Sequence, residues 1–177
     1  RDRVRMAMVF QSAALLNSLS VAENVGLYLT EHRRHPPAEI ARIVREKLEI
    51  VGLAGAEDKM PSELSGGMKK RAAIARALVM EPQLIVYDEP TSELDPLRSV
   101  TIGREILGLN HRLGVTSVVV THDRDLAFGV ANRIAFMSEG QVRFLGTPAE
   151  LRASTDPLVR DFLTIDFDEN RRSVEVP

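Results

Sequence analysis

The sequence has 177 residues, with 23 Lys and Arg against 25 Asp and Glu, which gives a formal net charge of −2. Hydrophobic residues make up 44% of the chain and charged residues 27%, so a disordered or collagen-like protein is excluded. Because there is no basic excess to attract phosphate backbones, nucleic acid is not an expected partner. The absence of Cys excludes a disulfide framework and a Cys-based zinc site.

Three short apolar runs predict β-strands. None of them alternates cleanly between apolar and polar residues, so each run predicts a strand buried on both faces, as in a parallel sheet covered by helices. The longest uninterrupted apolar run has five residues, whereas a membrane span needs about 20, so any membrane role is expected to come through a partner. The predicted strands are Val4–Phe10, Leu84–Tyr87 and Val115–Val120.

Helices are predicted between these strands from their end signals and apolar periodicity. Ser20 and Glu23 form a capping box, and Gly52 suits a helix end. Asp95 followed by Pro96 suits another helix start. The alternation of strands and helices predicts an α/β fold. The predicted helices are Val21–Leu29, a segment between Pro37 and Gly52, one from Ser65 through Ala72–Met80, and one from Asp95 to Leu113.

The pattern changes after the third strand. A short helix over Asp123–Ala131 is predicted to precede the strands Arg133–Ser138 and Gln141–Leu145, which Glu139 and Gly140 join as a tight hairpin. Two helix starts, at Thr147 and Asp156, follow. We therefore expect one domain over residues 1–163, with a helical subdomain over residues 12–62, and a polar tail over residues 164–177.

Polar residues follow each of the three predicted parallel strands. Gln11 follows the first, Asp88 and Glu89 follow the second, and Thr121 and His122 follow the third. Each alone has an ordinary reading: a loop amide, a solvated acidic turn, or a structural histidine. Because ligands bind beyond the carboxyl ends of parallel strands in open α/β sheets, their joint placement predicts a reaction site.

The segment Leu64-Ser65-Gly66-Gly67-Met68-Lys69-Lys70-Arg71 has a different kind of signal. A serine and two glycines at a helix start leave backbone N–H groups uncovered at the positive end of the helix dipole, where a phosphate fits. A plain helix cap is the alternative explanation, and it is favoured for an isolated Ser-Gly-Gly.

Taken together, these motifs resemble those of the nucleotide-binding subunits of ATP-binding cassette (ABC) transporters. Leu64–Met68 is similar to the signature motif and Leu84–Glu89 to the Walker B strand. Glu93-Leu94-Asp95 resembles the D-loop, Gln11 the Q-loop glutamine, and His122 the switch histidine. The resemblance implies a P-loop NTPase-like α/β fold, with a mostly parallel sheet, helices on both faces and an inserted helical subdomain.

Within that family, the sequence is most similar to the ATPase subunits of Mla-type phospholipid transporters, which work with Mce-domain proteins. The similar segments are Phe10–Leu15, Gly67–Arg71 and Asp156–Phe162. Two positions depart from the wider family. Position 68 is Met where Gln is common, although Met is usual in the Mla-like branch. Position 93 is Glu where Gly is common, which adds a side chain and a charge near the implied dimer interface.

The resemblance also implies roles for the residues at the site. Two subunits would face head to tail and trap two ATP molecules, each against Ser65, Gly66 and Gly67 of the opposite subunit, with Asp95 in the D-loop at the same interface. Asp88 would hold Mg²⁺, with Gln11 joining its shell. Glu89 would be the general base, and His122 would contact the γ-phosphate.

One element of the family pattern is missing. The phosphate-binding P-loop has the form GxxxxGK[ST], and no Gly-Lys dipeptide occurs in this sequence. In the family that loop and its strand precede the Q-loop. We therefore expect the sequence to be a fragment of a longer protein. The fragment lacks both the loop and its strand, and we expect it to be inactive alone.

The expected function is an ATPase subunit that powers transport of phospholipid or another lipid. It would form a homodimer, bind an integral membrane permease and work with an Mce-domain protein at the cytoplasmic face of the inner membrane. Residues 14–19 would lie in the groove for the permease, although local core packing explains their apolar character equally well. Two alternatives stay open: a soluble ABC ATPase acting on translation or DNA repair, and a non-catalytic partner-binding module.

Overall fold

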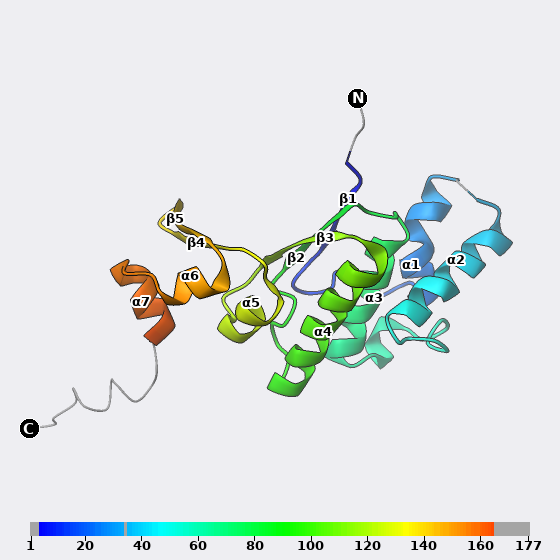
Figure 1. Cartoon of the computed structure of the whole chain (residues 1–177). Helices are drawn as coiled ribbons and strands as arrows, with labels where there is room; N and C mark the ends of the chain where they lie inside the picture. Colours follow the sequence, from blue (N-terminus) through cyan, green and yellow to red (C-terminus); the bar gives the residue numbers. More distant parts are fainter. Residues whose placement is uncertain (1–3, 34, 165–177) are drawn as a thin grey trace, which may run out of the picture. The chain divides into compact units, whose positions relative to one another are not determined.

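The computed structural model describes residues 4–33 and 35–164 (Figure 1). The chain divides into two compact units, residues 1–126 and residues 127–177. Each unit is described by itself below. The polar tail expected from residue 164 onward lies, except for Thr164, outside the described residues.

The first unit contains a parallel sheet of three strands in the order β1-β2-β3, which confirms the parallel α/β prediction. Val9 pairs with Tyr87, and Asp88 pairs with Val120, so the carboxyl ends of all three strands lie at one edge. The strands are β1 (Met6–Val9), β2 (Leu84–Asp88) and β3 (Thr116–Val120).

Only one face of this sheet is buried in the part of the chain that the structure describes. Helices α3 (Gly66–Leu78) and α4 (Pro96–Leu113) share one hydrophobic core with that face, whose side chains include Ile85 and Tyr87. Residues of the other face stay exposed: Met6, Met8, Val118 and Val120. The predicted burial on both faces is therefore not observed, because successive strand residues point to opposite faces and both helices pack against the same one.

A helical lobe follows β1 in the chain and packs on α3. Ser20 caps α1 (Val21–Glu31) as predicted, with its Oγ accepting a hydrogen bond from the Glu23 backbone N at 3.2 Å and its own N donating to Glu23 Oε2 at 2.7 Å. Helix α2 (Pro37–Ile50) contacts α1 and α3, and a short 3-10 helix, η1 (Pro61–Glu63), precedes the start of α3. Helices α1 and α2 fall within the expected helical subdomain and η1 crosses its end, while the boundaries at residues 12 and 62 stay a prediction.

A half-buried ionisable side chain lies between α3 and α4. Glu105 of α4 places its Oε1 3.8 Å from Arg71 Nε of α3, and burial raises the pKa of Glu105 to about 7, against the opposing effect of the Arg71 charge. The folded protein therefore holds this proton to a higher pH than the unfolded chain does.

We expect the free energy of unfolding to fall as pH rises from 4.5 to about 7 and then to level off, because only the folded state still binds this proton there. Glu105→Gln keeps the shape of the protonated side chain. The variant should match the original protein below pH 4.5 and exceed it by up to about 3 kcal/mol above pH 7. Urea titrations across this range measure the difference, and a constant difference at every pH would contradict the assignment.

The second unit contains an antiparallel hairpin of β4 (Ile134–Ser138) and β5 (Gln141–Gly146), as the sequence predicts. Glu139 and Gly140 connect the strands and both have positive φ, 51° and 73°, which a two-residue turn of this kind requires. The helices that complete this part of the chain are α5 (Arg124–Val130), which spans the boundary between the units, α6 (Pro148–Arg152) and α7 (Pro157–Thr164). Leu151 and Val159 are buried in it.

Candidate functional site

The carboxyl edge of the parallel sheet brings together the residues that follow its strands. Gln11 lies in the turn after β1, Asp88 is the last residue of β2, and His122 lies just after β3. The Glu89 backbone N continues the sheet by donating to the Val120 carbonyl at 2.9 Å. The structure thus places an amide, two carboxylates and an imidazole at one edge, as the sequence predicts.

Glu89 and His122 are in direct contact. Glu89 Oε1 lies 2.9 Å from His122 Nδ1 and accepts a hydrogen bond from the His122 backbone N at 3.1 Å. The carboxylate side chain is 19% exposed and the imidazole is 82% exposed. The hydrogen bond and negative charge of Glu89 raise the pKa of His122, because both favour the protonated ring.

Removing the Glu89 charge should lower the pKa of His122. In Glu89→Gln the ring loses its carboxylate partner, so a proton NMR titration should show His122 titrating at lower pH than in the unmodified protein. The other histidines, such as His111 in α4, serve as internal controls because they do not bond Glu89. An unchanged His122 titration would mean that the contact is not formed in solution.

The backbone of Glu89 has an unusual conformation. Its φ is 45°, in the left-handed region that non-glycine residues rarely occupy. Its carbonyl accepts hydrogen bonds from Ser92 N at 3.1 Å, Ser92 Oγ at 2.9 Å and Lys70 Nζ at 3.3 Å. Strained backbone of this kind persists only where surrounding groups fix it, and it is concentrated at functional sites.

Further residues of the loop after β3 also hold the Glu89 carboxylate. Thr121 Oγ1 donates to Glu89 Oε2 at 3.3 Å and accepts from the Asp123 backbone N at 3.0 Å. Asp123 Oδ2 in turn accepts from the buried hydroxyl of Thr91 at 3.1 Å. Both oxygens of Glu89 are therefore oriented by residues from this loop.

Sequence reasoning missed Lys70, which lies in α3 and contacts the same edge. Its side chain is 5% exposed, and its Nζ donates to the carbonyls of Gln11 and Glu89 and to Ser92 Oγ. A signal was available, because Lys70 lies one helical turn before the apolar Ile74 on the face that a buried helix turns to the core.

The residues of the predicted anion site lie at the start of α3. Ser65 is the N-cap, with its Oγ 3.4 Å from the Met68 backbone N. A Cβ added at Gly66 would be 3.4 Å from Leu94 Cδ2, and one added at Gly67 would meet nothing within 4 Å. The fold of this chain therefore has no steric need for glycine at position 67, whereas close approach of a phosphate would explain it.

The D-loop residues lie at the start of α4. Asp95 caps this helix by accepting from the Arg98 backbone N at 3.0 Å, and its carboxylate also pairs with the Arg98 guanidinium at 3.1 Å. Glu93 has a φ of 64°, which accounts for the frequent glycine at this position of the family pattern. Within the described residues, no hydrogen bond joins Ser65 or Asp95 directly to Glu89 or His122.

The donor set at the sheet edge suits magnesium with a bound phosphate. Mg²⁺ prefers oxygen ligands and is usually held by one or two carboxylates together with substrate phosphates and water. Asp88 supplies a half-buried carboxylate and Gln11 an exposed amide oxygen. No cluster of three or more His, Asp or Glu side chains that could hold a metal occurs in residues 4–33 and 35–164.

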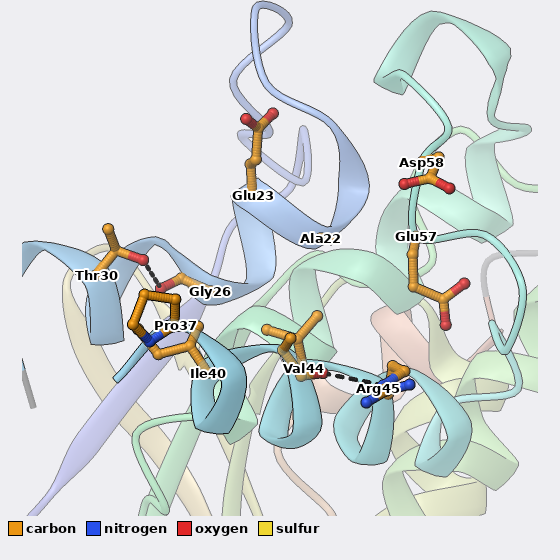
Figure 2. Close-up of a pocket in the computed structure, with 11 residues that line it drawn as sticks. Ala22, Glu23, Gly26, Thr30, Pro37, Ile40, Val44, Arg45, Glu57 and Asp58 are labelled. Atoms are coloured by element: carbon orange, nitrogen blue, oxygen red, sulfur yellow. Dashed lines mark hydrogen bonds between the residues drawn. The ribbon is translucent and has the colours of Figure 1, made fainter. Parts of the chain in front are cut away.

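A separate pocket lies in the helical lobe, between α1 and α2. Its volume is about 560 Å³, and its lining includes Ile40 and Val44 together with the acidic residues Glu23, Glu57 and Asp58 (Figure 2). None of the predicted site residues lines it. The pocket therefore belongs to the lobe and not to the sheet edge.

Two sequence relatives and one solved structure are similar over most of this chain. The Escherichia coli K12 intermembrane phospholipid transport system ATP-binding protein MlaF is 44% identical over 91% of the chain and 60% of its own length. The Mycobacterium leprae probable ribonucleotide transport ATP-binding protein mkl is 40% identical over 91% of the chain and 46% of its own length. A dimeric structure of the ATP-binding cassette MJ0796 with ADP and Pi matches with a TM-score of 0.71 and 34% identity, over 81% of this chain and 63% of that one.

The chain thus spans about half to three-fifths of the length of these curated relatives. The family described as ABC transporter matches residues 1–92, which are just over half of the 177 residues and include β1, the helical lobe, the signature segment and β2. The parallel α/β fold and the order of the motifs agree with that match. This chain therefore belongs to the ABC transporter family.

Proposed function

We propose that the protein containing this chain binds and hydrolyses ATP to power lipid transport through a membrane partner. The observation that supports this most strongly is the contact between Glu89 and His122 at the carboxyl edge of the sheet, next to Asp88. This carboxyl edge of the sheet, called the rim below, carries a general base, a proton-bearing imidazole and a metal-binding carboxylate. Together they suit hydrolysis of a terminal phosphate.

Each residue on the rim has a separate task in this proposal. Glu89 accepts a proton from the attacking water, His122 orients Glu89 and contacts the γ-phosphate, and Asp88 with Gln11 holds Mg²⁺. The metal, when bound, neutralises negative charge on the phosphates. Catalysis of phosphoryl transfer consists mainly of positioning and charge stabilisation, so the fixed backbone of Glu89 contributes directly.

In this proposal, a second copy of the chain completes the phosphate-binding site. We propose that Ser65, Gly66 and Gly67 of one subunit meet the nucleotide at the rim of the other, and that the D-loop with Asp95 lies at the same interface. The open space at Gly67 supports this. Because the 177 residues contain no Gly-Lys dipeptide, hydrolysis also requires a phosphate-binding loop from outside them, and residues 1–177 alone are expected to be inactive.

The membrane partner is proposed to bind near residues 14–19, which follow Gln11. Leu16 is 46% exposed, and the buried Asn24 fixes its backbone by accepting from Leu16 N at 2.8 Å and donating to Leu16 O at 3.0 Å. An exposed leucine with a fixed backbone, five residues after Gln11 in the chain, suits a surface that senses a permease helix. No helix within residues 4–33 and 35–164 has the length and apolar character to cross a bilayer. We place the protein at the cytoplasmic face of the inner membrane, bound to the permease.

The name of MlaF supports a phospholipid or other lipid as cargo, and an Mce-domain protein as a further partner follows from the resemblance to Mla-type systems. The test uses the product of the whole gene, purified with its integral membrane partner and reconstituted in vesicles containing a fluorescent phospholipid. ATP should drive lipid transfer, and Leu16→Asp should reduce both co-purification and transfer, whereas Leu113→Asp at the C-terminal end of α4, a leucine that is 44% exposed, should change neither.

Failure to co-purify with any membrane protein, together with ATP hydrolysis that depends on nucleic acid and falls with salt, would favour the ATPase of translation or DNA repair instead. Absence of any nucleotide binding by the whole gene product would favour the non-catalytic module.

A further inference from the structure

Lys70 is a buried cation that contacts two loops of the site at once. The ammonium group has three N–H donors, and each has an acceptor here: the Gln11 carbonyl, the Glu89 carbonyl at 3.3 Å and Ser92 Oγ at 3.1 Å. Gln11 follows β1, whereas Glu89 and Ser92 follow β2. A single side chain from α3 therefore joins the ends of two neighbouring strands.

Burying the Lys70 ammonium group has a free-energy cost, because the charge loses its contact with water. Burial lowers the pKa of Lys70, and the negative charges of Glu93 and Glu89 oppose that effect. A buried charge is tolerated only when it is paired and fully hydrogen-bonded. Loss of either loop contact would leave the ammonium under-satisfied, so the two loops are energetically linked through it.

Both loops have strained backbone that needs such anchors. Ala13 and Ala14, which follow Gln11, have φ values of 61° and 47°, and Glu89 has a φ of 45°. Arg76, also in α3, donates to the carbonyls of Ala13 at 2.9 Å and Ala14 at 2.6 Å. Arg76 thus holds the first loop alone, whereas Lys70 holds the first loop and the backbone of Glu89.

We propose that Lys70 is a positioning residue that couples the loop at Gln11 to the conformation of Glu89. When a partner displaces this loop, Lys70 loses its hydrogen bond to the Gln11 carbonyl and its ammonium group shifts. The hydrogen bond from Lys70 to the Glu89 carbonyl is then weakened. The Glu89 carboxylate then loses its alignment with His122. This inference rests on the proposed function for its catalytic consequence, while the link between the loops stands on the hydrogen bonds alone.

The first test measures the link without any activity. Amide hydrogen exchange by mass spectrometry compares peptides over residues 10–15 and 88–93 in the whole gene product and its variants. Lys70→Met should speed exchange about tenfold in both peptides, because both loops lose an anchor. Arg76→Met should speed exchange only in residues 10–15. Lys59→Met, which removes an exposed lysine of the same charge, should change neither peptide.

The second test measures the consequence for catalysis. Lys70→Met should leave the Kd for ATP unchanged and lower kcat by about 30-fold. This is less than the roughly 10²-fold loss that a small misplacement of a catalytic group can cause. Lys70→Arg, which keeps the charge and the donors, should recover most of kcat. If Lys70→Met does not fold, Lys70→Gln replaces it, because its amide keeps two of the donors.

The outcomes separate this inference from the proposed function. Faster exchange in residues 10–15 alone, or uniformly over the chain, would overturn the coupling, and so would a kcat for Lys70→Met within twofold of the original. If the unmodified protein hydrolyses no ATP, the proposed function fails, and exchange that rises in both peptides would still support the link between the loops.

Discussion

Replacing Glu89 by Gln should nearly stop ATP hydrolysis while leaving ATP binding intact. The amide cannot accept a proton from water, so kcat should fall by about 10²- to 10⁴-fold, the range that general acid and base catalysis supplies. Glutamine has the same size and can keep the contacts to Thr121 and to the His122 backbone N, so the rim should retain its shape. Phosphate release from the whole gene product measures kcat, and equilibrium binding of labelled ATP measures Kd.

The matched control is Glu49→Gln, which makes the same chemical change at an exposed position of α2. Its kcat and Kd should both equal those of the unmodified protein. A Glu89→Gln variant with near-normal turnover would remove Glu89 from the mechanism. A variant that loses ATP binding in proportion to kcat would instead mean that Glu89 contributes to the nucleotide site and not to proton transfer.

The second large effect is expected at the start of α3, where Gly67→Asp should have opposite effects on folding and activity. A Cβ at this position meets nothing within 4 Å, and a carboxylate in the first turn of a helix stabilises it by about 0.3 to 1 kcal/mol. The same charge would repel the phosphate of a nucleotide bound by the opposite subunit. We therefore expect the free energy of unfolding to stay level or rise, and hydrolysis to fall by about 10²-fold or more.

Gly67→Asn is the matched control, because it has almost the same shape without the charge. It should lose less activity than Gly67→Asp, and the difference between them isolates the electrostatic repulsion. Urea denaturation of both variants reports stability, and phosphate release reports hydrolysis. Equal activity of Gly67→Asp and the unmodified protein would show that no anion approaches this helix start.

The sequence was most informative where a residue type has few alternatives. Ser20 with Glu23 predicted the start of α1, and Glu139 with Gly140 predicted the hairpin, because each pair satisfies a specific local geometry. The parallel sheet followed from apolar runs separated by helices, and its edge then placed Glu89 near His122. These inferences depend on local chemistry and on the rule that parallel strands end together.

Other features depend on contacts between distant segments and could not be predicted in this way. The position of Lys70 on the core-facing side of α3 is visible in the sequence, but its partner at Gln11 lies 59 positions earlier in the chain and is not. The left-handed backbone of Glu89 arises from hydrogen bonds that form only in the folded structure. The exposed face of the sheet, with Met8 and Val118, also contradicts what uninterrupted apolar runs indicate, because composition alone does not tell which face a helix covers.

The most direct test is whether ATP joins two copies of the protein. Sedimentation equilibrium of the Glu89→Gln gene product should show the mass doubling when ATP and Mg²⁺ are added, with no doubling in ADP, because trapped nucleotide would bridge the rim of one copy and the α3 start of the other. Adding Gly67→Asp to this variant should prevent the doubling. An unchanged mass under conditions where ATP is measurably bound would contradict a site shared between two subunits.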